Sequence, residues 1–143
     1  MNASPKSVAI FSASFTAAAT ASGNVDTLGY DFAVVDLIES ASNAATNNCS
    51  VLKISESDDT VVSNFADVSG LIGDTDFTIP ASVTSGVQSV VQMRIDLRGR
   101  KRYLKLSASP LATQILTGVA HLHIGEEVPV NATDAGTGVL VAV

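Results

Sequence analysis

The chain has 143 residues, of which 46% are hydrophobic, 15% charged and 5% aromatic. This length fits one domain and excludes two large ones, and a domain of this size can bury a core without disulfides or a structural metal. The single Cys49 excludes an intrachain disulfide and a Cys-rich zinc site, while the net charge of −6 argues against a protein that coats nucleic acid.

The first 23 residues have some features of a signal peptide. Lys6 precedes the weakly apolar residues 8–11, and Ala19-Thr-Ala21 resembles a cleavage site. Serines interrupt the apolar run, however, and the alternation along residues 8–15 favours a β-strand. We therefore expect a strand here, with residues 1–6 as a possible N-terminal arm.

Apolar residues recur with period two along the whole chain, and turn-forming residues interrupt them about every ten positions. This spacing is typical of β-sandwiches and barrels. We predict a single all-β domain over residues 1–143, an antiparallel, jelly-roll-like β-sandwich of about eight strands. The expected strands are residues 8–15, 30–40, 50–56, 61–68, 77–79, 87–97, 102–109, 114–123 and 138–143.

The segment 30–40 gives the clearest strand pattern. Both of its faces are partly apolar, because Phe32 and Val34 lie on one face and Val35 and Leu37 on the other. A strand that is apolar on both faces usually lies in the centre of a sheet or against another subunit.

The segments between strands carry turn residues. Side-chain oxygens in residues 57–60 can bond nearby backbone N–H groups and form a tight hairpin turn. Gly99 can supply the positive φ that a short hairpin bend needs between residues 97 and 102. Residues 40–48 are almost all Ala, Ser, Thr and Asn, which predicts a surface connection, and Pro110 is expected at a strand end.

Residues capable of catalysis or metal binding are few. His121 and His123 fall on one face of a strand, and Glu126 and Glu127 follow, so a metal site is possible in principle. Half-exposed strand histidines are common, however, and the chain has no G-x-S-x-G motif for a serine nucleophile. We expect no enzyme activity, no catalytic residue, no cofactor and no metal site.

Two acidic pairs, Asp58-Asp59 and Asp74-Thr-Asp76, could supply oxygen ligands for calcium. They lack EF-hand spacing and lie in expected turns. Capping of those turns by their carboxylates is the simpler interpretation.

Positive charge is concentrated in one segment. Residues 94–105 contain six basic residues and one acid, a net charge of +5, so the rest of the chain carries −11. Four of these cations are expected at the hairpin tip, where they could bind an anionic protein surface, bind phosphates or remain solvated. We take the tip as the candidate partner contact and expect no nucleic-acid partner; its residues are Arg98, Arg100, Lys101 and Arg102.

Several phrases of the sequence resemble a known family. They are Ser-Glu-Ser-Asp-Asp at residues 55–59, Asp-Val-Ser-Gly at 67–70, and Arg-Ile-Asp-Leu-Arg-Gly-Arg-Lys-Arg-Tyr-Leu-Lys-Leu-Ser at 94–107, followed by Pro110. Over residues 30–110 the chain is similar to the capsid decoration, or cement, proteins of tailed phages, which are small β-sandwich structural proteins.

The resemblance implies a structural virion protein on the capsid surface, a bacteriophage protein that binds the major capsid protein and stabilises contacts between coat subunits. A homotrimer would fit this role, with no membrane partner. The alternative is an extracellular carbohydrate-binding or adhesion-type β-sandwich module. Sugar-binding surfaces generally need exposed aromatic rings, and the chain has two Tyr, five Phe and no Trp.

Overall fold

The computed structural model describes residues 5–40, 49–80, 88–124 and 139–142. Within these ranges the chain forms nine strands and one short 3-10 turn, η1 (Val62–Asn64). The strands are β1 (Lys6–Phe15), β2 (Ala21–Asp26), β3 (Phe32–Glu39), β4 (Cys49–Ser57), β5 (Ala66–Ile72), β6 (Ser89–Asp96), β7 (Tyr103–Pro110), β8 (Gln114–His123) and β9 (Val139–Ala142).

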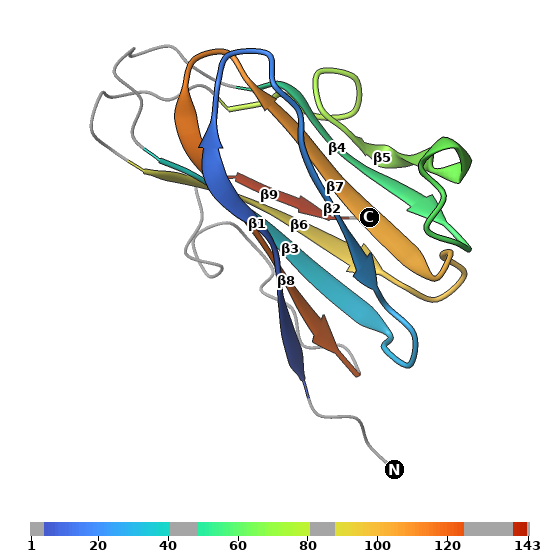
Figure 1. Cartoon of the computed structure of the whole chain (residues 1–143). Coiled ribbons are helices and arrows are strands. Elements are labelled where there is room, and N and C mark those ends of the chain that lie inside the picture. Colours follow the sequence, from blue (N-terminus) through green and yellow to red (C-terminus); the bar gives the residue numbers. More distant parts are fainter. Residues whose placement is uncertain (1–4, 41–48, 81–87, 125–138, 143) are drawn as a thin grey trace.

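The strands form two sheets that pack face to face (Figure 1). One sheet has the order β1-β8-β3-β6-β9 and the other β2-β7-β4-β5. The first eight strands make nested antiparallel pairs, β1 with β8, β2 with β7, β3 with β6 and β4 with β5. This nesting is the jelly-roll arrangement, so the predicted fold class is confirmed. The ninth strand, β9, adds to the edge of β6 in parallel.

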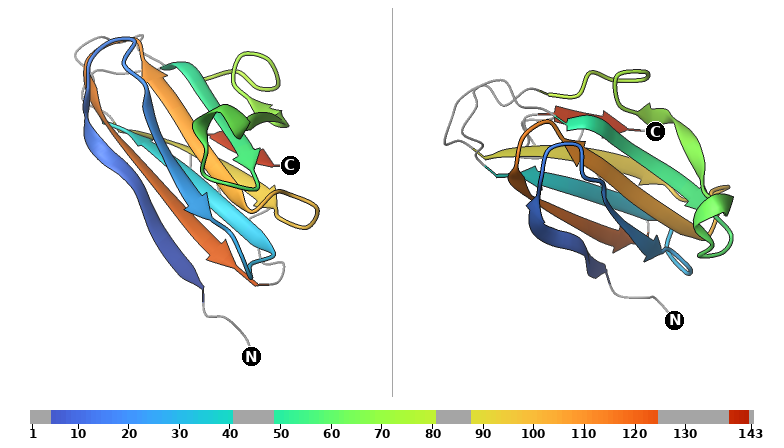
Figure 2. Two further views of the ribbon diagram at one scale, coloured as in Figure 1. Left: turned by 45° about the vertical axis from the view of Figure 1, so that its right-hand side comes forward. Right: turned by 45° about the horizontal axis from the view of Figure 1, so that its top comes forward.

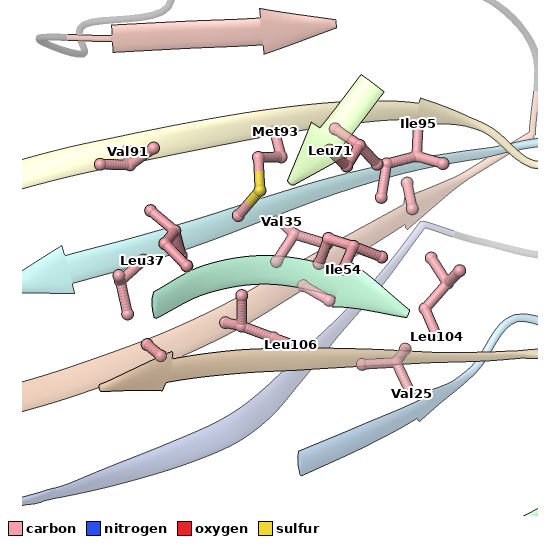
Figure 3. Close-up of a cluster of buried hydrophobic side chains, with 14 of the residues drawn as sticks. Val25, Val35, Leu37, Ile54, Leu71, Val91, Met93, Ile95, Leu104 and Leu106 are labelled. Atoms are coloured by element: carbon pink, nitrogen blue, oxygen red, sulfur yellow. The ribbon is translucent and has the colours of Figure 1, made fainter. Parts of the chain in front are cut away.

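The core lies between the two sheets and follows the period-two pattern of the sequence. Alternate residues of β3 and β6 point inward from one sheet, and alternate residues of β4 and β7 meet them from the other (Figure 3). Each fully buried aliphatic side chain contributes about 1.5–3 kcal/mol relative to an exposed one. The labelled members of this cluster are Val25, Val35, Leu37, Ile54, Leu71, Val91, Met93, Ile95, Leu104 and Leu106.

The strand at residues 30–40 is central, as its pattern predicts. It appears as β3, which pairs with β6 on one side and β8 on the other. On its outer face Val34 is also buried, with 7% of its surface exposed, which explains why both faces of this strand are partly apolar.

Strand β2 was not predicted. Its Ser-Gly-Asn sequence at residues 22–24 is typical of a turn, yet Ala21 and Val25 are buried and the strand pairs with β7 along its whole length. The close approach of β1 requires the glycine. A Cβ at Gly23 would lie 2.6 Å from Cγ2 and 2.7 Å from the carbonyl oxygen of Ile10.

One predicted strand is wrong in part and another is wrong altogether. In the predicted strand 61–68, residues 62–64 form η1 and pairing begins only at Ala66, because Asp59 accepts bonds from the Val61 N–H (2.9 Å) and the Asn64 amide (2.8 Å). Residues 77–79 form no strand; Phe77 makes a single bridge to Gly73.

Other local predictions are confirmed. The strand predicted at residues 8–15 is present within β1, Gly99 has a φ of +83°, and Pro110 ends β7. Of the possible arm, residues 1–4 lie outside the described residues, as do residues 41–48 of the predicted surface connection. In the part of the chain that the structure describes, no helix has the length and apolar character needed to span a membrane.

Candidate partner-contact site

Three loops meet at one end of the sandwich. They are the β2–β3 loop (residues 27–31), the β4–β5 loop (58–65) and the β6–β7 hairpin (97–102), and they lie at the right-hand end in Figure 1 and on the same end in both views of Figure 2. We call this surface the loop end. It carries all four residues predicted to contact a partner.

The β6–β7 hairpin is anchored to its neighbours through its backbone. The Arg100 N–H donates to the Leu97 carbonyl oxygen (3.0 Å), which closes the turn. Thr27 donates to the Arg102 carbonyl oxygen through both its N–H (3.0 Å) and its hydroxyl (2.6 Å), and the Lys101 N–H donates to Oε2 of Glu56 (3.2 Å). The hairpin is therefore tied to the β2–β3 loop and to β4.

Two arginines of the tip form two-point bonds with carboxylates. Nε and Nη2 of Arg98 donate to Asp96 at 2.9 and 2.7 Å, and those of Arg102 donate to Asp26 at 3.0 and 2.8 Å. The hydrogen bonds from the guanidinium groups lower the pKa of Asp26 and that of Asp96 to about 2. All four side chains stay ionised across the physiological pH range.

In the folded protein, carboxylates offset much of the positive charge that the sequence places at the hairpin tip. Nη1 of Arg100 lies 3.8 Å from Oε1 of Glu56, so each arginine of the tip has a carboxylate partner. Asp26 and Glu56 come from segments far away in the sequence. The loop end is therefore a surface of mixed charge, in which Lys101 is exposed and the Arg98 side chain is 61% exposed.

The loop end also exposes large aliphatic side chains, which sequence reasoning missed. Leu28 is 66% exposed, Val61 53% and Val62 75%. A strand was expected at residues 61–68, where Val62 would alternate into a sheet face, whereas η1 turns it outward. Arginine is enriched at protein–protein interfaces, and the buried centre of an interface is more apolar than the rest of the surface.

The two histidines lie on the outer face of the five-stranded sheet. Nδ1 of His121 is 3.0 Å from the Ser7 hydroxyl, and its Nε2 is 3.6 Å from Oδ2 of Asp36. Asp36 also accepts a bond from the Gln92 amide at 2.9 Å. These residues connect β1, β8, β3 and β6 in one polar chain across the sheet, so His121 joins strands.

Of the candidate metal ligands, the structure describes His121 and His123 only. Glu126 and Glu127 lie outside the described residues. Among the residues that are described, no three His, Cys, Asp or Glu side chains come together in a way that could hold a metal ion.

Three of the four carboxylates in the acidic pairs, those of Asp59, Asp74 and Asp76, act as turn caps, as predicted. Asp59 bonds the Val61 N–H, Oδ1 of Asp74 accepts from the Ile79 N–H (3.1 Å), and Oδ2 of Asp76 accepts from the N–H groups of Gly70 (2.7 Å) and Ile72 (3.0 Å). These carboxylates satisfy backbone donors that the strand ladders leave unpaired.

Comparison with known proteins assigns no family. No protein-family model matches the chain, and no curated protein matches its sequence. Among solved structures it is similar to BuGH86 in complex with neoagarooctaose (TM-score 0.45, 12% identity, 87% of this chain and 20% of that one). It is also similar to BtGH115A, a family GH115 4-O-methyl-alpha-glucuronidase with specificity for decorated arabinogalactans (TM-score 0.43, 12% identity, 88% and 18%). The chain thus spans about a fifth of the length of these proteins.

Proposed function

We propose that this protein is a structural virion protein that binds the outside of a viral capsid through its loop end and stabilises contacts between coat subunits. The observation that carries the proposal is an anchored hairpin whose exposed cations stand beside exposed aliphatic side chains. The resemblance of residues 55–59, 67–70 and 94–107 to phage cement proteins supports the same role, because these phrases include the tip itself.

Rigidity suits the loop end to binding. Ordering of flexible side chains and loops on association costs about 0.5–1.5 kcal/mol for each immobilised side chain. The ion pairs of Arg98 and Arg102 and the bonds from Thr27 already hold this surface in place. A coat protein that offers carboxylates to Lys101 and an apolar surface to Leu28 and Val62 would therefore bind with little further ordering.

Repetition of the shell would strengthen modest contacts. A homotrimer placed over neighbouring coat subunits makes its second and third contacts intramolecular, and such linkage can raise the overall affinity by about 10²–10⁴. The small surface of a single loop end is then sufficient. Binding of this kind holds adjacent subunits together and needs no catalytic group.

The alternative is a carbohydrate-binding or adhesion-type module, and the aromatic residues give it less support. All seven are half-buried, but most of their rings already contact other side chains of the protein and are therefore not free to stack on a sugar. Four of them pack against the core, and the rings of Phe65 and Tyr103 are covered by Lys105 and Arg102. The four that pack against the core are Phe11, Phe15, Tyr30 and Phe77.

The test is co-sedimentation with capsid shells assembled from the major coat protein of the genome that encodes this chain; a genome without a coat-protein gene would itself refute the capsid role. We expect the unaltered protein to sediment with the shells, and the double variant Val62→Asp, Lys101→Glu to bind at least tenfold more weakly. Both positions are exposed and leave the three arginine ion pairs in place.

The control is Leu111→Asp, which alters a side chain that is 49% exposed in the β7–β8 turn at the other end of the sandwich. It should bind as the unaltered protein does. Equal binding by all three proteins would show that the loop end is not part of the interface. No binding by the unaltered protein would refute the capsid role.

A further inference from the structure

Strand β1 is the least buried of the strands β1 to β8. None of its ten residues is buried, whereas each of the strands β2 to β8 contains at least two buried residues. Among the described strands β1 pairs with β8 alone, and residues 16–20 join it to β2. Detaching β1 would therefore take no buried side chain out of the core.

The place that β1 occupies is nevertheless shaped for this strand. The register with β8 shifts between Ala9 and Phe11, and Ile10 and Phe11 both pack against the core. A Cβ at Gly23 of β2 would lie 2.6 Å from Cγ2 of Ile10. A Cβ at Gly118 of β8 would lie 3.2 Å from Cζ of Phe11. Two consecutive large side chains thus meet two glycines, so the occupant that fits this place is β1 itself, from the same copy or from another.

The connection between β1 and β2 contains a strained turn. The Ala19 N–H donates to the Thr16 carbonyl oxygen (3.0 Å), which closes the turn at the arch between the two strands in Figure 1. Ala18 lies inside this turn with a φ of +63°, a region that glycine enters freely and that the Cβ of alanine disfavours. Extending the turn would release this strain. The bond from the Ala18 N–H to the Pro110 carbonyl oxygen (2.8 Å) would be lost, but both groups would then meet water.

We propose that β1 is exchanged between copies of this protein: β1 of one copy occupies the place beside β8 of a second copy, and residues 16–20 extend to link the two. The contacts of β1 with β8 and β2 are all kept, with the two sides now on different chains. Five extended residues span about 17 Å, which is the reach between the two sandwiches. The linking residues lie at the end opposite the loop end, so the exchange is independent of what the loop end binds.

Protein concentration decides between the closed and the exchanged form. Because the strand contacts are the same in both, the two forms differ mainly in the turn and in the freedom that is lost on association. Strain in a short connection favours exchange, and the lost freedom favours single copies. We therefore expect the exchanged form to increase with the concentration at which the protein is refolded.

A pair of cysteines across β1 and β8 reports which chain supplies β1. The hydroxyl oxygens of Ser12 and Thr117 are 3.0 Å apart on directly opposed residues, so cysteines at both positions can form a disulfide. A Cys49→Ala background removes the only other thiol. After refolding at high concentration and oxidation, we expect Ser12→Cys, Thr117→Cys to run as covalent dimers or larger oligomers on a denaturing gel without reductant. A closed copy would give an internal disulfide and a monomer band.

The matched control is Asn24→Cys, Lys105→Cys in the same Cys49→Ala background. These positions are opposed on β2 and β7, which remain on one side of the linking residues, so their disulfide should stay within one chain and give monomers. Ala18→Gly removes the strain of the turn. It should raise the concentration at which half of the chains are exchanged by at least fivefold.

Monomer bands alone from the β1–β8 pair, at every refolding concentration, would refute the exchange. Covalent oligomers formed to the same extent by the β2–β7 pair would also refute it, because the cross-links would then not depend on β1. If the cysteine variants fail to fold, the native mass of the unaltered protein after the same refolding decides. A strict monomer, or an oligomer whose amount Ala18→Gly leaves unchanged, refutes the exchange, whereas an oligomer that Ala18→Gly reduces supports it.

Discussion

Arg102, the last residue of the β6–β7 hairpin, and Asp26, the last residue of β2, form a two-point ion pair, with Nε 3.0 Å from Oδ1 and Nη2 2.8 Å from Oδ2. The pair lies just outside the ladder in which Asp26 stands opposite Tyr103, and the Arg102 guanidinium carbon lies 5.0 Å from the centre of the Tyr103 ring. It therefore fixes the base of the hairpin that carries the other three cations of the tip.

The first prediction concerns this pair and pH. Because the bonds from Arg102 lower the pKa of Asp26 to about 2 from 3.8, the carboxylate stabilises the fold above pH 3.8, and this contribution is lost as the pH falls through about 2. Asp26→Asn should lower the urea midpoint slightly at pH 7 and flatten the decline between pH 4 and 2. The control is Asp58→Asn, at an exposed position of the β4–β5 loop. If stability declined between pH 4 and 2 in Asp26→Asn as steeply as in the unaltered protein, the ion pair would not be the source of this decline.

The second prediction tests the contact between β1 and β2. Gly23→Ala should destabilise the protein by about 1–3 kcal/mol in urea unfolding, because the added Cβ meets both the side chain and the carbonyl oxygen of Ile10. Adding Ile10→Ala removes the side-chain clash and leaves the backbone one, so the double variant should not recover stability. Full recovery would show that the side chain alone sets the constraint.

The third prediction compares a buried and an exposed aliphatic residue. Ile54 is fully buried between the sheets, and Ile54→Ala should cost about 2–5 kcal/mol. Val62 is 75% exposed, and Val62→Ala should change stability by less than about 0.5 kcal/mol. Chemical denaturation of both variants measures the difference; similar losses would mean that Val62 is packed in solution.

The fourth prediction concerns the cap of the β4–β5 loop. Asp59 accepts bonds from the Val61 N–H and the Asn64 amide, and these bonds lower its pKa. Asp59→Ala should speed hydrogen exchange at the Val61 amide at least tenfold, whereas Asp58→Ala should leave it unchanged. Unaltered protection in Asp59→Ala would show that the loop holds its shape without this cap.

The sequence predicts the fold class because period-two alternation is a local signal. Alternate apolar residues such as Val35 and Leu37 indicate which face of the strand is buried, and both are buried in the structure. It does not predict β2, because Ser22, Gly23 and Asn24 are turn formers by themselves. Their extended conformation depends on pairing with β7, some eighty residues further along the chain.

The candidate contact site shows the same limit. The cations of the tip are neighbours in sequence and are easily recognised, whereas their partners Asp26 and Glu56 are brought to them by the folding of distant strands. The exposure of Val62 likewise depends on the Asp59 cap, which replaces the start of the predicted strand by a 3-10 turn. Net charge counted along the chain therefore overstates the positive potential of this surface.

The parallel strand β9 covers the edge of β6, so the described five-stranded sheet ends in β1 on one side and in β9 on the other. β1 begins with a lysine and has an irregular register between Ala9 and Phe11. A charged start and a break in register both discourage a foreign strand from joining an edge. Copies of this protein crowded side by side would thus resist fusing into fibrils through the edge of β1.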